Sequence, residues 1–149
     1  GANISQSKLL SHTFEGNTKA NGTKNGVVNT ALMYLNAPHL KGGTLPFGID
    51  AAGLSQMAYK LNGYLLARTA ELQSKQGEPL SFIEESEAGD LAFFDNAEGV
   101  IDHVGIILPD NHVIHCHGKV RIDRIDHTGI FNNQTNQYSH SLRVIKNIV

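Results

Sequence analysis

The chain has 149 residues, which suits one domain, and its composition of 40% apolar and 17% charged residues is that of an ordinary globular protein. The formal net charge of −2 and the lack of any Lys/Arg run give no indication of a nucleic-acid partner. No stretch approaches the roughly 18 apolar residues of a membrane helix, so we expect no membrane segment. The single cysteine, Cys116, excludes an internal disulfide framework and a multi-cysteine zinc site.

The first part of the chain is polar and rich in Gly, Asn, Thr and Lys. This composition predicts that residues 1–25 form an extended lead-in or linker, and that residues 26–149 form one domain. The sequence opens with Gly1 rather than Met, so we leave the first two residues out of the functional argument and expect another domain to precede this stretch.

Three helices are predicted in the first half of the domain. Apolar residues at four-residue spacing indicate a helix over 26–36, which Pro38 ends. After a Gly-rich loop, a second helix is predicted over 51–61, with Asp50 at its N-cap position. A third, short helix is predicted over 69–75.

The second half of the chain reads as short strands separated by turn signals. The expected strands cover 91–94, 104–108, 113–117, 120–125 and 142–149. Helices followed by a run of antiparallel strands predict an α+β fold, with the helix that begins at Ala51 packed on the sheet.

The start of that second helix is where a nucleophile is expected. A helix N-terminus lowers the pKa of a thiol and offers backbone N–H groups to a developing oxyanion. The sequence there, Phe47-Gly48-Ile49-Asp50-Ala51-Ala52-Gly53-Leu54, contains no nucleophile.

Several motifs nevertheless resemble those of one enzyme family. Asp50-Ala51-Ala52-Gly53 resembles an Asp-Cys-Ser-Gly signature in all but two residues. The further motifs are Asp102-His103-Val104-Gly105-Ile106, Val113-Ile114-His115, Gly89-Asp90-Leu91-Ala92-Phe93-Phe94, the loop residues Pro38, Gly42 and Gly43, and Leu66, Arg68 and Gln73. Over roughly residues 26–126 the chain resembles the NlpC/P60 family of cysteine peptidases.

The resemblance implies a papain-like fold with a helix N-terminus facing an antiparallel sheet. It implies that position 51 is the nucleophile, His103 the general base and His115 its orienting partner, while Asp50 and position 52 hold the substrate. The implied ancestral reaction is hydrolysis of γ-D-glutamyl-diamino acid bonds in murein peptides, in the bacterial cell envelope or the cytoplasm. We expect no cofactor, and a monomer whose partner is a murein-derived peptide or another small molecule.

The sequence departs from the family pattern at positions expected to line the cleft. Ala51 replaces the cysteine and Ala52 the following serine, and a methyl group cannot attack a carbonyl. His39 stands for an aromatic residue, Lys41 for a Trp, and Ala67-Arg68-Thr69 for Pro-Arg-Asp. The substrate-binding positions are therefore expected to be His39, Lys41, Asp50, Ala52, Arg68 and Thr69.

Three hypotheses follow. The first is a catalytically inactive peptidase domain, natural or engineered, that still binds murein-type peptides. The second is a rebuilt enzyme in which a desolvated Lys41 forms a Schiff base with a carbonyl substrate. The third is an interaction module without a small-molecule site.

The remaining chemistry-bearing side chains have simpler interpretations. Adjacent strand residues point to opposite faces, so Cys116 is expected to be a buried core thiol and His117 to lie at the cleft rim beside His115. A metal site formed by His39, His103 and His115 is not expected, since the family's two histidines are hydrogen-bonded in series. No chemistry is expected of the other polar side chains considered, namely His12, His112, His127, His140, Asp102, Glu84 and Glu85.

Overall fold

The computed structural model describes residues 16–149, with side chains from residue 23 onward. The helical elements are α2 (Gly16–Leu32), α3 (Ala51–Lys60), α4 (Ala70–Gln73) and the 3-10 turn η1 (Ile83–Glu85). The strands are β1 (Thr44–Leu45), β2 (Gly48–Ile49), β3 (Glu78–Leu80), β4 (Leu91–Asp95), β5 (Ile101–Leu108), β6 (His112–His117), β7 (Lys119–Ile125), β8 (Gly129–Asn132) and β9 (Gln137–Asn147). The predicted α+β class is confirmed.

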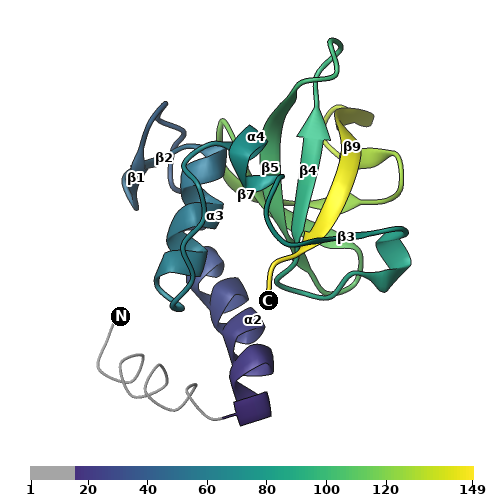
Figure 1. Ribbon diagram of the computed structural model, residues 1–149. Helices are drawn as coiled ribbons and strands as arrows, with labels where there is room; N and C mark the ends of the chain where they lie inside the picture. Colours follow the sequence, from purple (N-terminus) through teal and green to yellow (C-terminus); the bar gives the residue numbers. More distant parts are fainter. Residues whose placement is uncertain (1–15) are drawn as a thin grey trace.

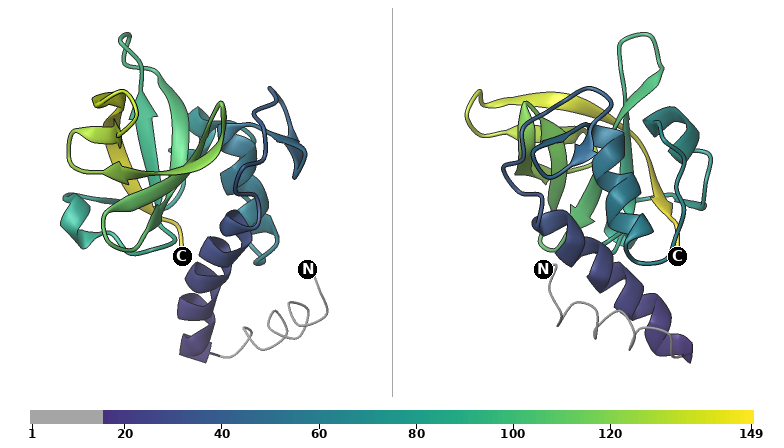
Figure 2. Two further views of the ribbon diagram at one scale, coloured as in Figure 1. Left: turned by 180° about the vertical axis from the view of Figure 1, so that it is seen from behind. Right: turned by 90° about the vertical axis from the view of Figure 1, so that its left-hand side faces the viewer.

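The main sheet is antiparallel throughout and closes on itself. Its strand order is β3-β9-β4-β5-β6-β7-β8, and β8 also pairs with β9, so the last six strands form a small barrel. Helices α2 and α3 lie together on one side of this barrel (Figures 1 and 2). None of the helices in the described part of the chain is long and apolar enough to cross a membrane.

Alternation along the strands divides the core in two. Residues such as Val104 and Ile106 face the helices and belong to the larger apolar cluster, together with Val27, Leu54 and Tyr59. The opposite face fills the barrel interior with a smaller cluster, made of Ala92, Phe94, Ile107, Val113, Ile125, Ile130 and Ile145. His103 and His115 share this inner face, because each is an odd number of residues away from a helix-facing neighbour.

Helix α2 differs from its prediction at both ends. It begins at Gly16 rather than residue 26, so residues 16–25 are helical and not an extended lead-in. Lys24, in this stretch, is buried and its ammonium lies 2.6 Å from Glu87 and 3.1 Å from Asp90, which ties the helix to the loop before β4. The helix ends at Leu32, where i→i+3 bonds replace the helical ladder and the chain turns through Asn36 at a positive φ of 73°. The 25/26 division between linker and domain stays a prediction.

The observed bounds of the later elements agree more closely with their predictions. Helix α3 begins at Ala51 with Asp50 as its N-cap, as predicted, and α4 is shorter than the expected 69–75. Four of the five predicted strands coincide with β4 to β7 to within a few residues, and β9 begins five residues before the expected position. The short strands β1, β2, β3 and β8 were missed, since two to four residues are too few to show a periodic pattern.

Candidate active site

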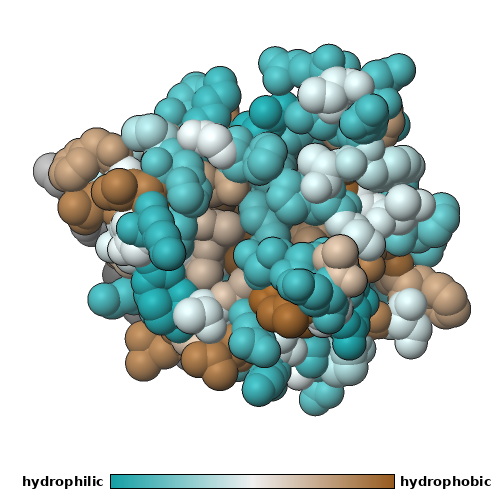
Figure 3. Space-filling model, turned by 90° about the horizontal axis from the view of Figure 1, so that it is seen from above, coloured by the Kyte–Doolittle hydropathy of each residue, from teal (hydrophilic) through white to brown (hydrophobic). Residues whose placement is uncertain are grey.

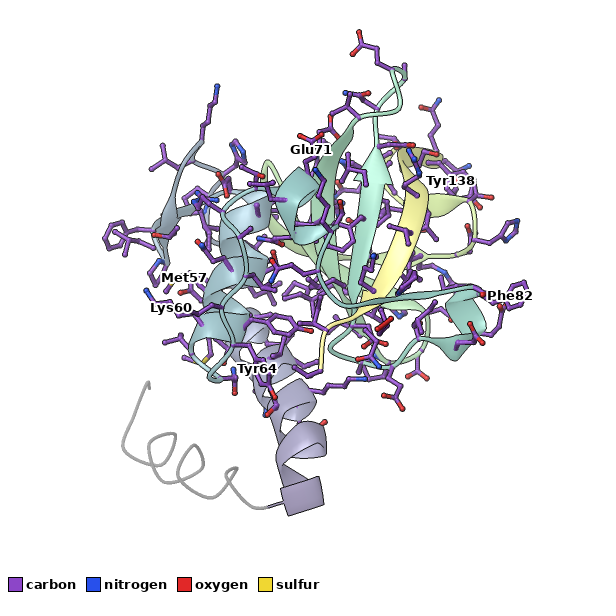
Figure 4. All side chains as sticks on the ribbon, in the orientation of Figure 1. Met57, Lys60, Tyr64, Glu71, Phe82 and Tyr138 are labelled. Atoms are coloured by element: carbon purple, nitrogen blue, oxygen red, sulfur yellow. The ribbon has the colours of Figure 1, made fainter. Side chains whose placement is uncertain are left out.

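A cleft of about 1230 Å³ opens where the N-terminus of α3 meets the end of the barrel. The loop before β1, the start of α4 and the β8–β9 hairpin border it. Figure 3 looks down on this end of the molecule and shows a hollow with a mostly hydrophilic rim and a paler, more apolar floor. In Figure 4, Glu71 marks α4 and Tyr138 marks β9, which border the cleft on two sides.

Asp50 holds the start of α3 in place. One carboxylate oxygen accepts the N–H of Gly53 at 2.6 Å, and the other accepts that of Gly42 at 2.9 Å. Arg68 adds a bidentate ion pair, with N···O distances of 3.0 and 2.9 Å. Burial alone would raise the pKa of Asp50, but the bonds from Arg68 and the two amides outweigh it and lower the pKa. Asp50 is therefore an anchored carboxylate in the cleft wall.

Ala51 and Ala52 are the first two residues of α3, and both line the cleft. The first amides of an α-helix have no acceptor within the helix, so this position suits an oxyanion or a bound carbonyl. The Gln73 amide fixes the local backbone, because its Nε2 donates to the carbonyl of Ala52 at 3.0 Å and to that of Ala67 at 2.8 Å. The scaffold for a nucleophile is complete, but the side chain at position 51 is a methyl group.

On the barrel side of the cleft, three polar side chains form a hydrogen-bonded series. His103 Nε2 lies 2.9 Å from His115 Nδ1, and His115 Nε2 lies 2.7 Å from the Asp123 carboxylate. Asp123 is also held by Arg121, whose Nε and Nη2 donate at 2.8 and 3.1 Å. All three members of the series are buried. The predicted pairing of His103 with His115 is thus observed, and Asp123 extends it by one residue.

The hydrogen-bonded series determines which ring nitrogens of His103 and His115 carry protons. Burial would raise the pKa of Asp123, but its bonds to His115 and Arg121 lower it, so this carboxylate is ionised and only accepts. Burial lowers the pKa of His115 in spite of Asp123, and it lowers that of His103 well below the ordinary value, so both imidazoles are neutral. His115 Nε2 then carries a proton, its Nδ1 accepts from His103 Nε2, and the lone pair of His103 is on Nδ1. This arrangement leaves His103 able to act as a base.

His140 also belongs to the site, although no role was predicted for it from the sequence. It comes from β9, lines the cleft and stacks on His103, with ring centroids 4.0 Å apart and an interplanar angle of 19°. Burial and its histidine neighbours lower its pKa to about 4. His117 lies at the rim as predicted, edge-on to His140 at 4.9 Å. The residues around His140 are polar and gave no strand prediction, so its position in the cleft was missed. That position depends on the pairing of β8 with β9, which closes the barrel.

The structure also places two other side chains that could act as nucleophiles, Lys41 and Cys116. Lys41 lines the cleft, but it is exposed, so the desolvated setting on which the Schiff-base hypothesis depends is not observed there. Cys116 is the buried thiol that alternation predicted, donating to the carbonyl of Ile49 at 3.3 Å. Burial and the charge of Asp50 raise its pKa to about 11, which keeps it a thiol at neutral pH.

Most of the predicted site residues meet in this one cleft. His39, Lys41, Asp50, Ala51, Ala52, Arg68, Thr69 and His103 all line it, and His115 lies directly behind His103. Thr69 caps α4, accepting the N–H of Leu72 at 3.3 Å. The sequence missed Asp123 and Arg121, though a signal was present: an acidic residue two positions before Ile125 shares the inward face of a strand. His12 lies outside the described residues.

Comparison with known proteins agrees with this geometry. The model of the NlpC/P60 family matches residues 36–140. The chain is 34% identical over 124 residues to dipeptidyl-peptidase 6 of Lysinibacillus sphaericus, covering 80% of this chain and 41% of that protein. It is 34% identical over 96 residues to the gamma-D-glutamyl-L-lysine dipeptidyl-peptidase of Bacillus subtilis, covering 63% of this chain and 32% of that protein. The chain therefore spans about a third to two fifths of the length of these relatives.

Solved structures show the same fold. An NlpC/P60 family protein from Bacillus cereus superposes with a TM-score of 0.70 at 25% identity, over 84% of this chain and 40% of that one. The peptidoglycan hydrolase RipB from Mycobacterium tuberculosis gives a TM-score of 0.72 at 20% identity, over 94% of this chain and 70% of that one. These likenesses confirm the predicted papain-like NlpC/P60 fold.

Proposed function

Because the chain belongs to the NlpC/P60 family of cell-wall peptidases, we propose that it is a peptide-binding domain that keeps the family's cleft but has no nucleophile. The observation that carries this proposal is the completeness of everything around position 51. Asp50, the start of α3 and the His103–His115–Asp123 series are all in hydrogen-bonded places, and only the attacking atom is missing.

The loss stops the reaction at its first covalent step. In a cysteine peptidase the thiolate attacks the carbonyl carbon, and the base first removes the thiol proton. His103 offers a neutral imidazole for that proton, but Ala51 has none to give and no lone pair to attack with. A peptide bound in the cleft is therefore held and not cut.

The ligand we propose is a peptide carrying a γ-D-glutamyl bond to a diamino acid, from murein of the bacterial envelope or recycled in the cytoplasm. The names of the relatives from Bacillus and Lysinibacillus motivate this choice of peptide. Within the cleft, the exposed Lys41 suits a carboxylate of such a peptide, while Asp50, whose carboxylate is paired with Arg68, forms the wall beside it. His39, Ala52, Arg68 and Thr69 complete the proposed contact surface.

The first test is a calorimetric titration of the chain with L-Ala-γ-D-Glu-diaminopimelate. We expect saturable binding to one site, and at least tenfold weaker binding of the isomer with an α-linked glutamate. A flat titration with both peptides would overturn the proposal.

A second test restores the missing groups. We expect the double variant Ala51→Cys/Ala52→Ser to hydrolyse the γ-linked peptide slowly, while the original chain releases no product. The matched control adds His103→Ala to the double variant and should abolish the gained activity, because the new thiol then lacks its base. If the original chain released product as fast as the double variant, the nucleophile would lie elsewhere.

A further inference from the structure

The cleft gathers an unusual share of the imidazoles in the chain. Of the eight histidines, His39, His103, His117 and His140 line the cleft and His115 lies directly behind it. Two of the remaining three, His112 and His127, lie away from it, and His12 is outside the described residues. The His103–His115–Asp123 series accounts for two of these imidazoles, but His140, stacked on His103, has no part in that series, and this points to a second kind of ligand.

We propose that His103, His115 and His140 bind a divalent transition-metal ion such as Zn²⁺. One ring nitrogen from each of the three lies within 4.8 Å of the other two. Zinc–imidazole bonds of about 2.0–2.1 Å place tetrahedral ligands roughly 3.3 Å apart. The 2.9 Å between His103 Nε2 and His115 Nδ1 is already close to that spacing.

His140 completes the ligand set by a small movement. Its ring lies flat against that of His103, so the ring must tilt its nitrogen edge toward the other two imidazoles. The side chain is only partly buried and borders the open cleft, which leaves space for this tilt. This set differs from the one considered from the sequence, in which His39 was the third histidine. The pairing of β8 with β9 brings His140 to this place instead.

Asp123 supplies the outer support that metal-binding histidines commonly have. A carboxylate that accepts from the far nitrogen of a ligand histidine orients the ring and increases its basicity. Asp123 does this for His115 at 2.7 Å, and Arg121 holds the carboxylate in turn. The nitrogen that faces His103 therefore already presents a lone pair.

Metal binding changes only one proton position. His103 Nε2 gives up its role as donor to His115 Nδ1, and the proton of this neutral imidazole moves to Nδ1, so that both facing nitrogens offer lone pairs to the ion. With three protein ligands the fourth tetrahedral position opens to the cleft, where water or a carboxylate can bind. The ion and a peptide thus share one cavity, but the ion requires nothing of Ala51 or Asp50.

The test is a calorimetric titration of the EDTA-treated, dialysed chain with ZnCl₂. We expect one ion per chain, and at least tenfold weaker binding in His140→Phe, which keeps the stacked ring but removes both nitrogens. The matched control, His127→Phe, alters an exposed histidine outside the cluster and should bind as the original chain does. Circular dichroism verifies that both variants are folded, and His103→Gln provides a second removal of a ligand.

Cobalt substitution tests the ligand set directly. We expect Co²⁺ to give the intense visible bands of a four-coordinate site, and these bands to be lost in His140→Phe and His103→Gln but not in His127→Phe. No saturable uptake of Zn²⁺, or equal uptake by the original chain and His140→Phe, would overturn the proposal. Zinc uptake without peptide binding would refute the proposed function alone, and peptide binding by the EDTA-treated chain without zinc uptake would refute this inference alone.

Discussion

Replacing Asp123 with asparagine tests whether the buried histidine series stabilises the fold. The carboxylate accepts three hydrogen bonds, one from His115 and two from Arg121. Asparagine offers only one oxygen and directs an N–H₂ group at the remaining donors, so at least one donor is left unpaired. Bonds to a charged group contribute about 1.5–3 kcal/mol each, and removal of one partner of a buried pair costs about 3–5 kcal/mol. The Arg121 side chain is 18% exposed, so we expect a loss near the lower end, about 2–4 kcal/mol.

The assay is urea unfolding at pH 7, monitored by circular dichroism. With a slope of about 2 kcal/mol per molar urea, the expected loss lowers the midpoint by about 1–2 M. Asp95→Asn is the matched control, since it removes an ion pair whose partner Arg143 has a 52% exposed side chain, and such pairs contribute less than about 1 kcal/mol. A midpoint shift in Asp123→Asn no larger than that in Asp95→Asn would refute the reasoning.

Three further predictions concern the residues around the cleft. The pKa of Asp50 is lowered in the folded state, so its carboxylate stabilises the fold above its ordinary pKa and this stabilisation is lost as the pH falls through the folded-state pKa. The difference in unfolding free energy between the original chain and Asp50→Asn should therefore shrink below about pH 4 in acid titrations. Cys116, with its pKa raised to about 11, should react with iodoacetamide at pH 7.5 about 100-fold more slowly in the folded chain than in urea, whereas fast labelling of the folded chain would indicate an activated thiol. A methyl group at Gly105 would lie 2.6 Å from Val113 Cγ2, so Gly105→Ala should lower the free energy of unfolding by about 1–3 kcal/mol in the same urea assay, and an unchanged midpoint would contradict this packing.

The parts of the fold that the sequence predicted are those with a strong local signal. Helix α3 has a capping aspartate and an apolar face, and β4 to β7 are apolar runs bounded by turn residues. The start of α2 was missed because residues 16–25 are polar and show no apolar periodicity, and the tie of Lys24 to Glu87 joins residues far apart in the sequence. Strand β8 was missed because four residues carry too little pattern.

The residues of the candidate site also fall into those with a local sequence signal and those without one. Asp50, His103 and His115 stand in motifs, so their meeting was predictable from sequence. Asp123 and His140 are placed by strand register: β7 sets Asp123 opposite Val113, and β9 brings His140 to the open end of the barrel. The local sequence around His140 carries no signal of this placement, whereas Asp123 shares the inward face of its strand with Ile125, a pattern that could have identified it.

A cleft without a nucleophile can be stable because the hydrogen bonds that support it do not involve the side chain of position 51. Asp50 is satisfied by Arg68 and two amides, and His115 by Asp123, so none of the bonds that hold these groups ends on the side chain of position 51. A cysteine at position 51 would add an attacking atom, and Ala51 lacks one while these supporting bonds stay in place. The same independence applies to the histidine cluster, whose neutral imidazoles are held by the barrel and by Asp123 rather than by α3. The proposed loss of the reaction and the proposed retention of the binding surface are therefore compatible in one fold, and the histidine cluster keeps its geometry for a metal ion.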